Sequence, residues 1–249
     1  MIGLPSSVTA LLFDLDGVLT STAVIHSQAW KQAFDTFLQT YPADDATQKR
    51  PFDQNDYLQY VDGRSRDDGI TTFLRSRNIT LPPGSPDDGT HDATVAGIGN
   101  TKNALFLDIL KTKGAQAYPD AVAYLNAAQE AQLAIAVVTS SKNGAEILRA
   151  TGLDSYVQAR VDGLVIAEQG LAGKPAPDSF LAGAKALGVA PAQAAVFEDA
   201  VSGVQAGHAG KFGHVVGVDR TEGDTHGHEL KQAGADVVVE ALTELLDPR

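Results

Sequence analysis

The stretch Leu11–Thr20, LLFDLDGVLT, places two carboxylates, Asp14 and Asp16, directly after an apolar run. The apolar residues 8–13 predict a short buried strand that ends where the acids begin. Because side chains alternate along a strand with a period of two, Asp14 and Asp16 are expected on the same side. Gly17 allows the chain to turn away after them. This pattern indicates a functional site more than an ordinary solvated strand end.

Composition narrows the classes of protein to which the chain can belong. Its 249 residues include 31 acidic and 19 basic side chains, which gives a net charge of −12. Such a balance argues against general binding of nucleic acid or of anionic membrane surfaces. The chain has no cysteine, so disulfides and thiolate metal sites are excluded. The first residues carry neither a signal-peptide pattern nor a membrane-spanning run, and we expect a cytoplasmic protein.

Strand and helix patterns alternate through the second half of the chain. Further strands are predicted at 133–139, 194–199, 214–220 and 235–240, with helices between them and a closing helix after the last. This alternation predicts an α/β fold with a doubly wound parallel sheet of the Rossmann type. Residues 22–113 show helical periodicity and no convincing strand. We therefore expect one α/β domain from residues 1–21 and 114–249, with residues 22–113 inserted as a helical domain.

Polar segments follow the predicted strands or lie in a nearby loop: DLDG at 14–17, TSSKNG at 139–144, GKPAPD at 173–178 and ED at 198–199. Each one alone could be a turn or a helix cap. In parallel sheets, however, ligands bind beyond the carboxyl ends of the strands. The four acids that directly follow strands, two lysines and several hydroxyl groups are therefore expected to meet at one edge of the sheet.

These four segments resemble, in order and spacing, the four motifs of the haloacid dehalogenase superfamily. The stretches TSTAVIHSQAWKQAF (20–34), SSKNG (140–144) and GKPAPDSFL (173–181) are similar to the β-phosphoglucomutase-like subgroup. The resemblance implies a Rossmann-like core with a mobile helical cap. It also implies magnesium-dependent phosphoryl transfer through an aspartyl-phosphate, with a small sugar phosphate as substrate.

The resemblance gives the core residues their expected roles. Asp14 would be the nucleophile and Asp16 the general acid and base. A magnesium ion would be held by the Asp14 carboxylate, the Asp16 backbone carbonyl and Asp199, with Glu198 as a supporting acid. The residues expected to bind phosphate or sugar on the core side are Thr139, Ser140, Ser141, Lys142, Asn143 and Lys174.

The inserted helical domain also matches positions of the subgroup. Thr22 and His26 would couple closure of the cap to Asp16. Arg66 would grip the phosphate that is not being transferred, as a bidentate clamp. The further expected substrate contacts are Gly63, Arg64, Lys102 and Asn103, although Arg64 and Lys102 could equally be solvated surface charges.

Three positions depart from the subgroup's pattern: Asp62 stands in place of a lysine, Ser21 in place of an acid and Gly69 in place of a serine. Asp62 removes positive charge from the loop that would meet a bisphosphate. The match to the subgroup, with His26, Arg66 and SSKNG (140–144) retained, favours a mutase, whereas these departures leave a sugar-phosphate phosphatase open as the alternative. A non-catalytic binding protein is disfavoured because every residue of the core chemistry is present. We expect a monomer, with no nucleic-acid or membrane partner.

Overall fold

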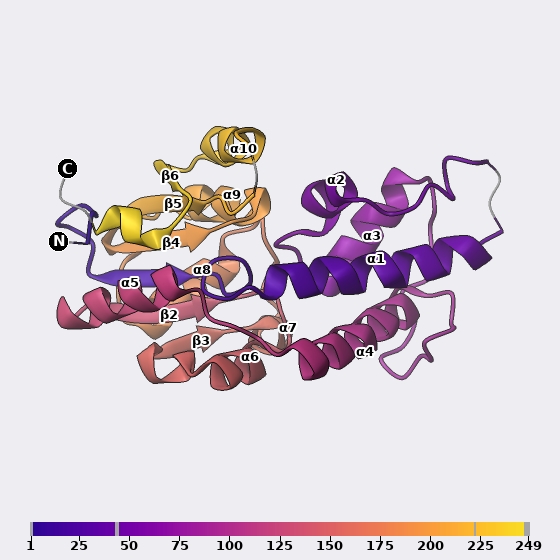
Figure 1. Cartoon of the computed structure of the whole chain (residues 1–249), viewed down its shortest axis with the longest axis horizontal. Coiled ribbons are helices and arrows are strands. Elements are labelled where there is room, and N and C mark those ends of the chain that lie inside the picture. The colour runs from indigo at the N-terminus through magenta and orange to yellow at the C-terminus, as the bar shows by residue number, and fades with distance from the viewer. Residues whose placement is uncertain (1, 43–44, 222, 247–249) are drawn as a thin grey trace. The chain divides into compact units, whose positions relative to one another are not determined.

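The structure is a computed structural model that describes residues 2–42, 45–221 and 223–246. The chain divides into two compact units, one formed by Met1–Thr22 with Ala115–Arg249 and the other by Ala23–Gly114. The first unit contains the sheet and the second is an insertion after its first strand (Figure 1). Both domain boundaries expected from the sequence, after residues 21 and 113, lie one residue earlier than these.

The first unit is built on a parallel sheet of six strands in the order β3-β2-β1-β4-β5-β6. The strands are β1 (Ala10–Phe13), β2 (Ala134–Val138), β3 (Ala159–Val161), β4 (Ala194–Glu198), β5 (His214–Val218) and β6 (Val237–Val239). Every residue of β1 and β4 is buried, as expected for central strands that are covered on both faces. The predicted α/β fold with a doubly wound parallel sheet is confirmed.

Helices connect these strands and lie against the sheet (Figure 1). They are α5 (Pro119–Glu130), α6 (Gly144–Thr151), α7 (Gly163–Glu168), α8 (Asp178–Ala186), α9 (Val201–Ala209) and α10 (Thr225–Ala233). At the centre, Phe13 of β1 stacks on Phe197 of β4 with ring centroids 4.3 Å apart, and Tyr124 of α5 meets Phe13 edge-on at 6.2 Å. This packing fixes the two strands whose ends carry the acidic motifs.

The strand order places a topological switch point between β1 and β4. From β1 the chain continues to β2 and β3 on one side, whereas β4, β5 and β6 extend the sheet on the other. In open α/β sheets the crevice at such a point, beyond the carboxyl ends of the strands, is where ligands bind. The DLDG and ED motifs follow the two strands that border it.

Two elements differ from the sequence-based expectation. The edge strand β3 was not predicted, because its three residues, Ala159, Arg160 and Val161, form no apolar run. The expected closing helix is a single 3-10 turn at Leu242–Leu245 within the described residues. Both elements are at the margins of the sheet, where tertiary packing decides the local conformation more than the hydrophobic pattern does.

The second unit is helical. It contains α1 (Thr22–Thr40, which begins at the last residue of the first unit), α2 (Gln54–Asp56), a π-helical turn (Tyr57–Val61), α3 (Arg66–Ser76) and α4 (Val95–Lys113). The part described, residues 23–42 and 45–114, contains no strand. Phe34 lies at the middle of its aromatic core, with ring centroids 5.1 Å from Trp30, 5.0 Å from Phe52 and 4.3 Å from Phe73.

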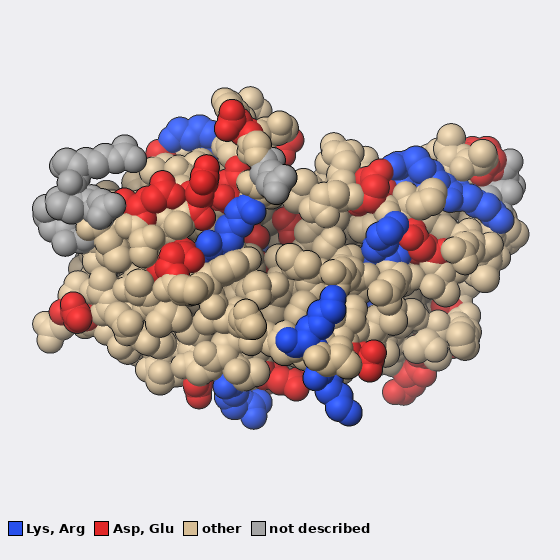
Figure 2. All heavy atoms as spheres, in the orientation of Figure 1, with Lys and Arg blue, Asp and Glu red and all other residues tan. Residues whose placement is uncertain are grey.

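Charged side chains form scattered patches on a face made mostly by other residues (Figure 2). On the face drawn in Figure 2, acidic groups gather over the upper part of the sheet-bearing unit, and basic groups stand singly or in small groups. No helix of the described residues combines the length and the apolar character that a membrane crossing requires. The acidic bias of the sequence is thus visible on this face.

A buried ion pair ties the helical unit together. Asp56, 1% exposed, accepts a hydrogen bond from the Arg77 guanidinium at 2.6 Å and another from Arg50 at 2.7 Å. The backbone amide of Asp56 donates to the carboxylate of Asp53, and the amide of Asp53 donates to the carboxylate of Asp56. These two hydrogen bonds cap the N-terminus of α2. Removing this carboxylate would leave Arg77, 7% exposed, as an uncompensated buried cation.

We predict that Asp56→Ala lowers the free energy of unfolding by about 3–5 kcal/mol, the usual cost of breaking one side of a buried ion pair. Trp30 is the only tryptophan and lies in the core of the same unit, so urea denaturation followed by its fluorescence reports this loss. The exposed Asp108→Asn on α4 is the matched control and should change stability by less than about 0.5 kcal/mol. Equal stability of Asp56→Ala and the wild type would show that the pair contributes nothing.

Candidate active site

The ammonium group of Lys174 joins the ends of three strands. Its Nζ lies 2.6 Å from Oδ1 of Asp14, after β1, and 2.5 Å from Oε1 of Glu198, at the end of β4. It also donates to the carbonyl of Val138, the last residue of β2, at 3.2 Å. All three charged side chains are buried, with Lys174 2% and Glu198 0% exposed. The structure thus brings together three predicted site residues that stand up to 184 positions apart in the chain.

Burial and charge set the ionisation of this group. Burial is the largest cause that raises the pKa of Asp14 to about 8; Lys174 opposes the rise, and Glu198 and Asp16 add to it. Burial alone would lower the pKa of Lys174, but the carboxylates of Asp14 and Glu198 outweigh it and raise that pKa. Further positive charge beside Asp14 would favour the ionised form that a nucleophile needs.

Asp16 is held by two hydroxyl groups. Oγ1 of Thr22 donates to its Oδ1 at 2.5 Å, and Oγ1 of Thr139 lies 3.2 Å from its Oδ2. Thr20 shares a hydrogen bond of 2.6 Å with Thr22. The backbone amide of Asp16 donates to Oδ2 of Asp14 at 3.0 Å, so the two acids are also linked to each other. The side chain of Asp16 is therefore oriented from two sides while it stays half-buried.

The turn after Asp16 requires a glycine. Gly17 has φ +92°, and a Cβ there would lie 1.8 Å from Oδ2 of Asp199. The Asp199 carboxylate therefore lies against the backbone of the DLDG turn. The four predicted acids, Asp14, Asp16, Glu198 and Asp199, occupy the ends of the neighbouring strands β1 and β4.

The loop after β2 holds the predicted hydroxyl-rich group. The amide of Ser141 donates to Oγ1 of Thr139 at 3.1 Å, and the amide of Asn143 donates to Oγ of Ser141 at 3.2 Å. Thr139 is buried, Ser140 is half-buried and Lys142 is exposed. The loop thus folds on itself around Thr139, which also contacts Asp16.

The segment after β3 shapes this loop, and the sequence analysis did not identify it. The amide of Gly163 donates to the carbonyl of Ser141 at 2.9 Å, and a Cβ on Gly163 would lie 2.6 Å from the carbonyl oxygen of Ser140. Asp162, 0% exposed, accepts from the amides of Leu164 and Val165 as the N-cap of α7. The signal in the sequence was the VDG triplet before an apolar run, which is typical of a capped helix start.

The acids supply oxygen donors of the kind that magnesium prefers. No three or more histidine or acidic side chains of the described residues form a metal-binding group by themselves. The predicted set needs only two carboxylates and one backbone carbonyl, which suits an ion that keeps several of its waters. Both Glu198 oxygens are already engaged, Oε1 by Lys174 and Oε2 by the amide of Ala200 at 3.0 Å. Both Asp14 oxygens also accept hydrogen bonds, from Lys174 at 2.6 Å and from the amide of Asp16 at 3.0 Å. The type of donor nevertheless fits Mg²⁺ on Asp14, Asp16 and Asp199, with Glu198 in a supporting position.

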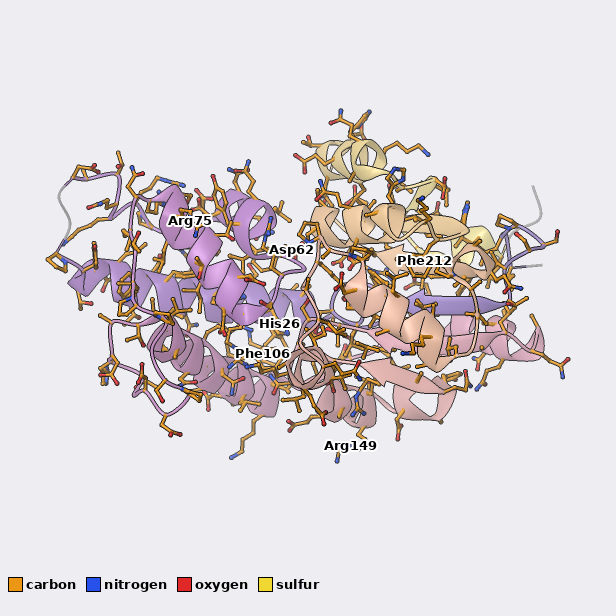
Figure 3. All side chains as sticks on the ribbon, turned by 180° about the vertical axis from the view of Figure 1, so that it is seen from behind. His26, Asp62, Arg75, Phe106, Arg149 and Phe212 are labelled. Carbon is orange, nitrogen blue, oxygen red and sulfur yellow. The ribbon has the colours of Figure 1, made fainter. Side chains whose placement is uncertain are left out.

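The helical unit brings its predicted residues into two pairs. Nζ of Lys102 lies 2.6 Å from Nδ1 of His26, and about 5 Å from the ring centroids of Trp30 (5.0 Å) and Phe106 (4.9 Å). The rings of His26 and Phe106 are 4.1 Å apart and lie side by side in Figure 3. Lys102 is 4% exposed, so it is not the solvated surface charge that the sequence left open. His26 thus pairs with Lys102 inside the helical unit. Thr22, which belongs to the first unit, contacts Asp16.

The second pair is formed by Arg66 and Asn103, with Nη2 of Arg66 2.8 Å from Oδ1 of Asn103. Burial lowers the pKa of Arg66, and the neighbouring Asp67 opposes this. Gly63 has φ +70° and lies with Arg64 in the short turn that leads into α3, whose N-cap is Ser65. Arg64 is half-buried. These four predicted residues therefore lie at or near the start of α3 and on the neighbouring α4.

Comparison with known proteins agrees with this geometry. The family model for haloacid dehalogenase-like hydrolases matches residues 8–211. A β-phosphoglucomutase of Mycobacterium tuberculosis is 51% identical over 99% of this chain and 94% of its own length. A β-phosphoglucomutase of Bacillus subtilis is 30% identical over 95% of this chain and 91% of its own length.

Among solved structures, a hydrolase from Pseudomonas syringae is similar with a TM-score of 0.75 and 25% identity, and 96% of each chain is covered. The match of the family model covers most of the chain, and the motifs at the ends of β1, β2 and β4 lie inside it. The chain belongs to the haloacid dehalogenase-like hydrolase family.

Proposed function

We propose that the protein is a β-phosphoglucomutase, which converts β-glucose 1-phosphate to glucose 6-phosphate through an aspartyl-phosphate and a sugar bisphosphate. The observation that carries the proposal is the pairing of Asp14 and Glu198 on one buried lysine, beside an Asp16 that two hydroxyls orient. The 51% identity to a β-phosphoglucomutase over nearly the whole chain supports the choice within the family.

In this proposal a trace of sugar bisphosphate first phosphorylates Asp14. A second hydroxyl of β-glucose 1-phosphate then attacks this aspartyl-phosphate: its oxygen bonds to phosphorus, its proton passes to Asp16, and the bond from phosphorus to Asp14 breaks, which gives the bisphosphate. Asp14 next attacks the other phosphate of the bisphosphate. The bond from phosphorus to the sugar oxygen breaks, and Asp16 gives its proton to that leaving oxygen. The fixed position of Asp16 between Thr22 and Thr139 supports both proton transfers.

Positive charge and hydrogen-bond donors near Asp14 would stabilise the phosphoryl group during transfer. Lys174 supplies the charge, and Thr139 and Ser140 lie on the loop that would supply hydroxyl donors. A magnesium ion held by Asp14, the Asp16 carbonyl and Asp199 would neutralise the anionic oxygens that repel a carboxylate nucleophile. The loop residues Ser141, Lys142 and Asn143 would contact the sugar or its phosphate.

We propose that residues 22–113 act as the mobile cap domain. We propose that Arg66, with Asn103 beside it, binds the phosphate that stays in place, and that Gly63 and Arg64 contact it from the turn before α3. Lys102 and His26 would respond to closure as a pair, since they already share a hydrogen bond. The enzyme is expected to act as a monomer in the cytoplasm.

A phosphatase that hydrolyses sugar phosphates is the second candidate. The observation that favours it is Asp62, which places a carboxylate directly before Gly63 in the loop proposed to meet phosphate. A negative charge there weakens the binding of a bisphosphate, and water would then compete for the aspartyl-phosphate. The same core residues serve either outcome.

Two assays of the purified protein with magnesium separate the candidates, and a variant of Arg66 sharpens them. Conversion of β-glucose 1-phosphate to glucose 6-phosphate, with a trace of the bisphosphate, should exceed phosphate release from either sugar phosphate.

Arg66→Ala should lower kcat/KM for this isomerisation roughly 30- to 150-fold, because a charge-assisted bidentate contact contributes about 2–3 kcal/mol. Hydrolysis of 4-nitrophenyl phosphate, which has no second phosphate, should change little.

Arg75→Ala is the matched control, since Arg75 is an exposed arginine in the last turn of the same helix (Figure 3). It should leave both reactions unchanged. Equal losses on both substrates in Arg66→Ala would show that Arg66 supports the fold instead. Phosphate release that outpaces isomerisation in the wild type would favour the phosphatase.

The metal proposal has its own test. Asp199→Ala should raise the magnesium concentration for half-maximal activity at least about tenfold, because it removes one of two carboxylate ligands from a hard-ion site. A magnesium titration of activity measures this shift, and EDTA should abolish the wild-type reaction. The exposed Asp154→Ala serves as the control for loss of one negative charge. Wild-type activity that persists in EDTA would contradict the role of the metal.

A further inference from the structure

Arg220, two residues beyond β5, belongs to none of the four motifs, yet its guanidinium has an acceptor for each of its five N–H groups. Nε donates to the carbonyl of Gly17 at 2.9 Å and Nη2 to the carbonyl of Val18 at 3.0 Å. The other N–H groups reach the two oxygens of Asp120, at 2.9 and 3.3 Å, and the carbonyl of Glu240 at 3.4 Å. One side chain thus connects the turn that follows the catalytic acids to α5 and to the end of the sheet.

The guanidinium also lies over an aromatic ring. Its carbon atom lies 3.8 Å from the ring centroid of Tyr118, the N-cap residue of α5. The partner carboxylate is itself fixed, because Oδ2 of Asp120 accepts from the amide of Leu242 at 2.8 Å. Although burial opposes it, hydrogen bonds from Arg220 and from this amide lower the pKa of Asp120. Arg220 therefore bonds to the Gly17–Val18 turn from a rigid support.

The turn that Arg220 holds is short and carries the proposed acid and base. Gly17 follows Asp16 directly, and its amide donates to the carbonyl of Thr20 at 2.8 Å. The hydroxyl of Thr20 in turn bonds to that of Thr22, which donates to Asp16. Asp199 lies against Gly17. A shift of the Gly17 and Val18 carbonyls would therefore move the backbone next to Asp16.

We propose that Arg220 is a positioning residue for phosphoryl transfer: by holding the Gly17 and Val18 carbonyls, it keeps the carboxyl of Asp16 aimed at the leaving oxygen. The proposal rests on the proposed role of Asp16 as general acid. Arg220 itself touches no reacting atom. Lysine cannot replace it, because an ammonium has three donors and no plane to stack on tyrosine.

Loss of a residue that acts through Asp16 should slow the reaction of some substrates more than that of others. A sugar alkoxide is a poor leaving group and needs the proton from Asp16, whereas 4-nitrophenolate leaves readily without one. General acid catalysis contributes about 10²–10⁴-fold where it is needed. Damage to the position of Asp16 should therefore appear in kcat/KM for phosphate release from the sugar phosphate, which reports the formation of the aspartyl-phosphate with loss of the sugar oxygen, and much less in that for the aryl phosphate.

The test compares Arg220→Gln and Arg220→Lys with wild type in phosphate release from glucose 6-phosphate and from 4-nitrophenyl phosphate. Both variants should lose at least about tenfold more kcat/KM on the sugar phosphate than on the aryl phosphate. Arg149→Gln is the control, since Arg149 projects outward from α6 (Figure 3) and should change neither value. Equal losses on the two substrates, or no loss, would overturn the proposal.

A second measurement does not depend on activity. Amide hydrogen exchange should become faster at residues 15–20 in both Arg220 variants, while strands β2 and β4 keep their protection. No change in the turn, or a uniform change across the chain, would overturn the proposal. If the wild type turned over neither substrate, the proposed function would fail, and the exchange experiment would still decide whether Arg220 holds the turn.

Discussion

The buried lysine at the ends of β1, β2 and β4 is the constraint on which the rest of the structure depends. Two carboxylates, Asp14 and Glu198, cannot both stay ionised in an apolar interior without a cation between them. Lys174 meets this need at 2.6 and 2.5 Å, and it reaches the site from the loop before α8. The sheet order places β1 beside β4, and the loop before α8 returns Lys174 to their ends. Removing Lys174 would leave two neighbouring buried carboxylates without their cation.

This arrangement also explains why the active centre needs further polar support. Asp14 is buried enough that its pKa rises to about 8, so burial favours the protonated form that cannot attack phosphorus. Lys174 opposes this effect only in part, because Glu198 shares its charge. Further positive charge beside Asp14, such as the proposed magnesium ion, would favour the ionised nucleophile, while Thr22 and Thr139 hold Asp16 beside it.

The sequence correctly predicted the contacts between charged residues that lie at or near the strand ends. Asp14, Glu198 and Lys174 were expected to meet because the carboxyl ends of parallel strands share one edge, and the structure brings them within hydrogen-bond distance. The edge strand at 159–161 was missed because Arg160 interrupts its apolar pattern. The pairing of Arg66 with Asn103 depends on how α3 packs on α4, which no local pattern encodes. Arg220 was overlooked for the same reason, since its partners Gly17, Val18 and Asp120 lie 100 or more residues away.

The central claim is that Asp14 carries the phosphoryl group, and trapping the aspartyl-phosphate tests it most directly. The protein is mixed with magnesium and glucose 1,6-bisphosphate, quenched in acid and reduced with borohydride, which converts an aspartyl-phosphate to homoserine. Peptide mass spectrometry then locates the product. The account predicts homoserine at position 14 in the wild type and none in an Asp14→Asn variant that keeps the wild-type circular dichroism. Homoserine at another aspartate, or at none while the wild type turns over substrate, would contradict it.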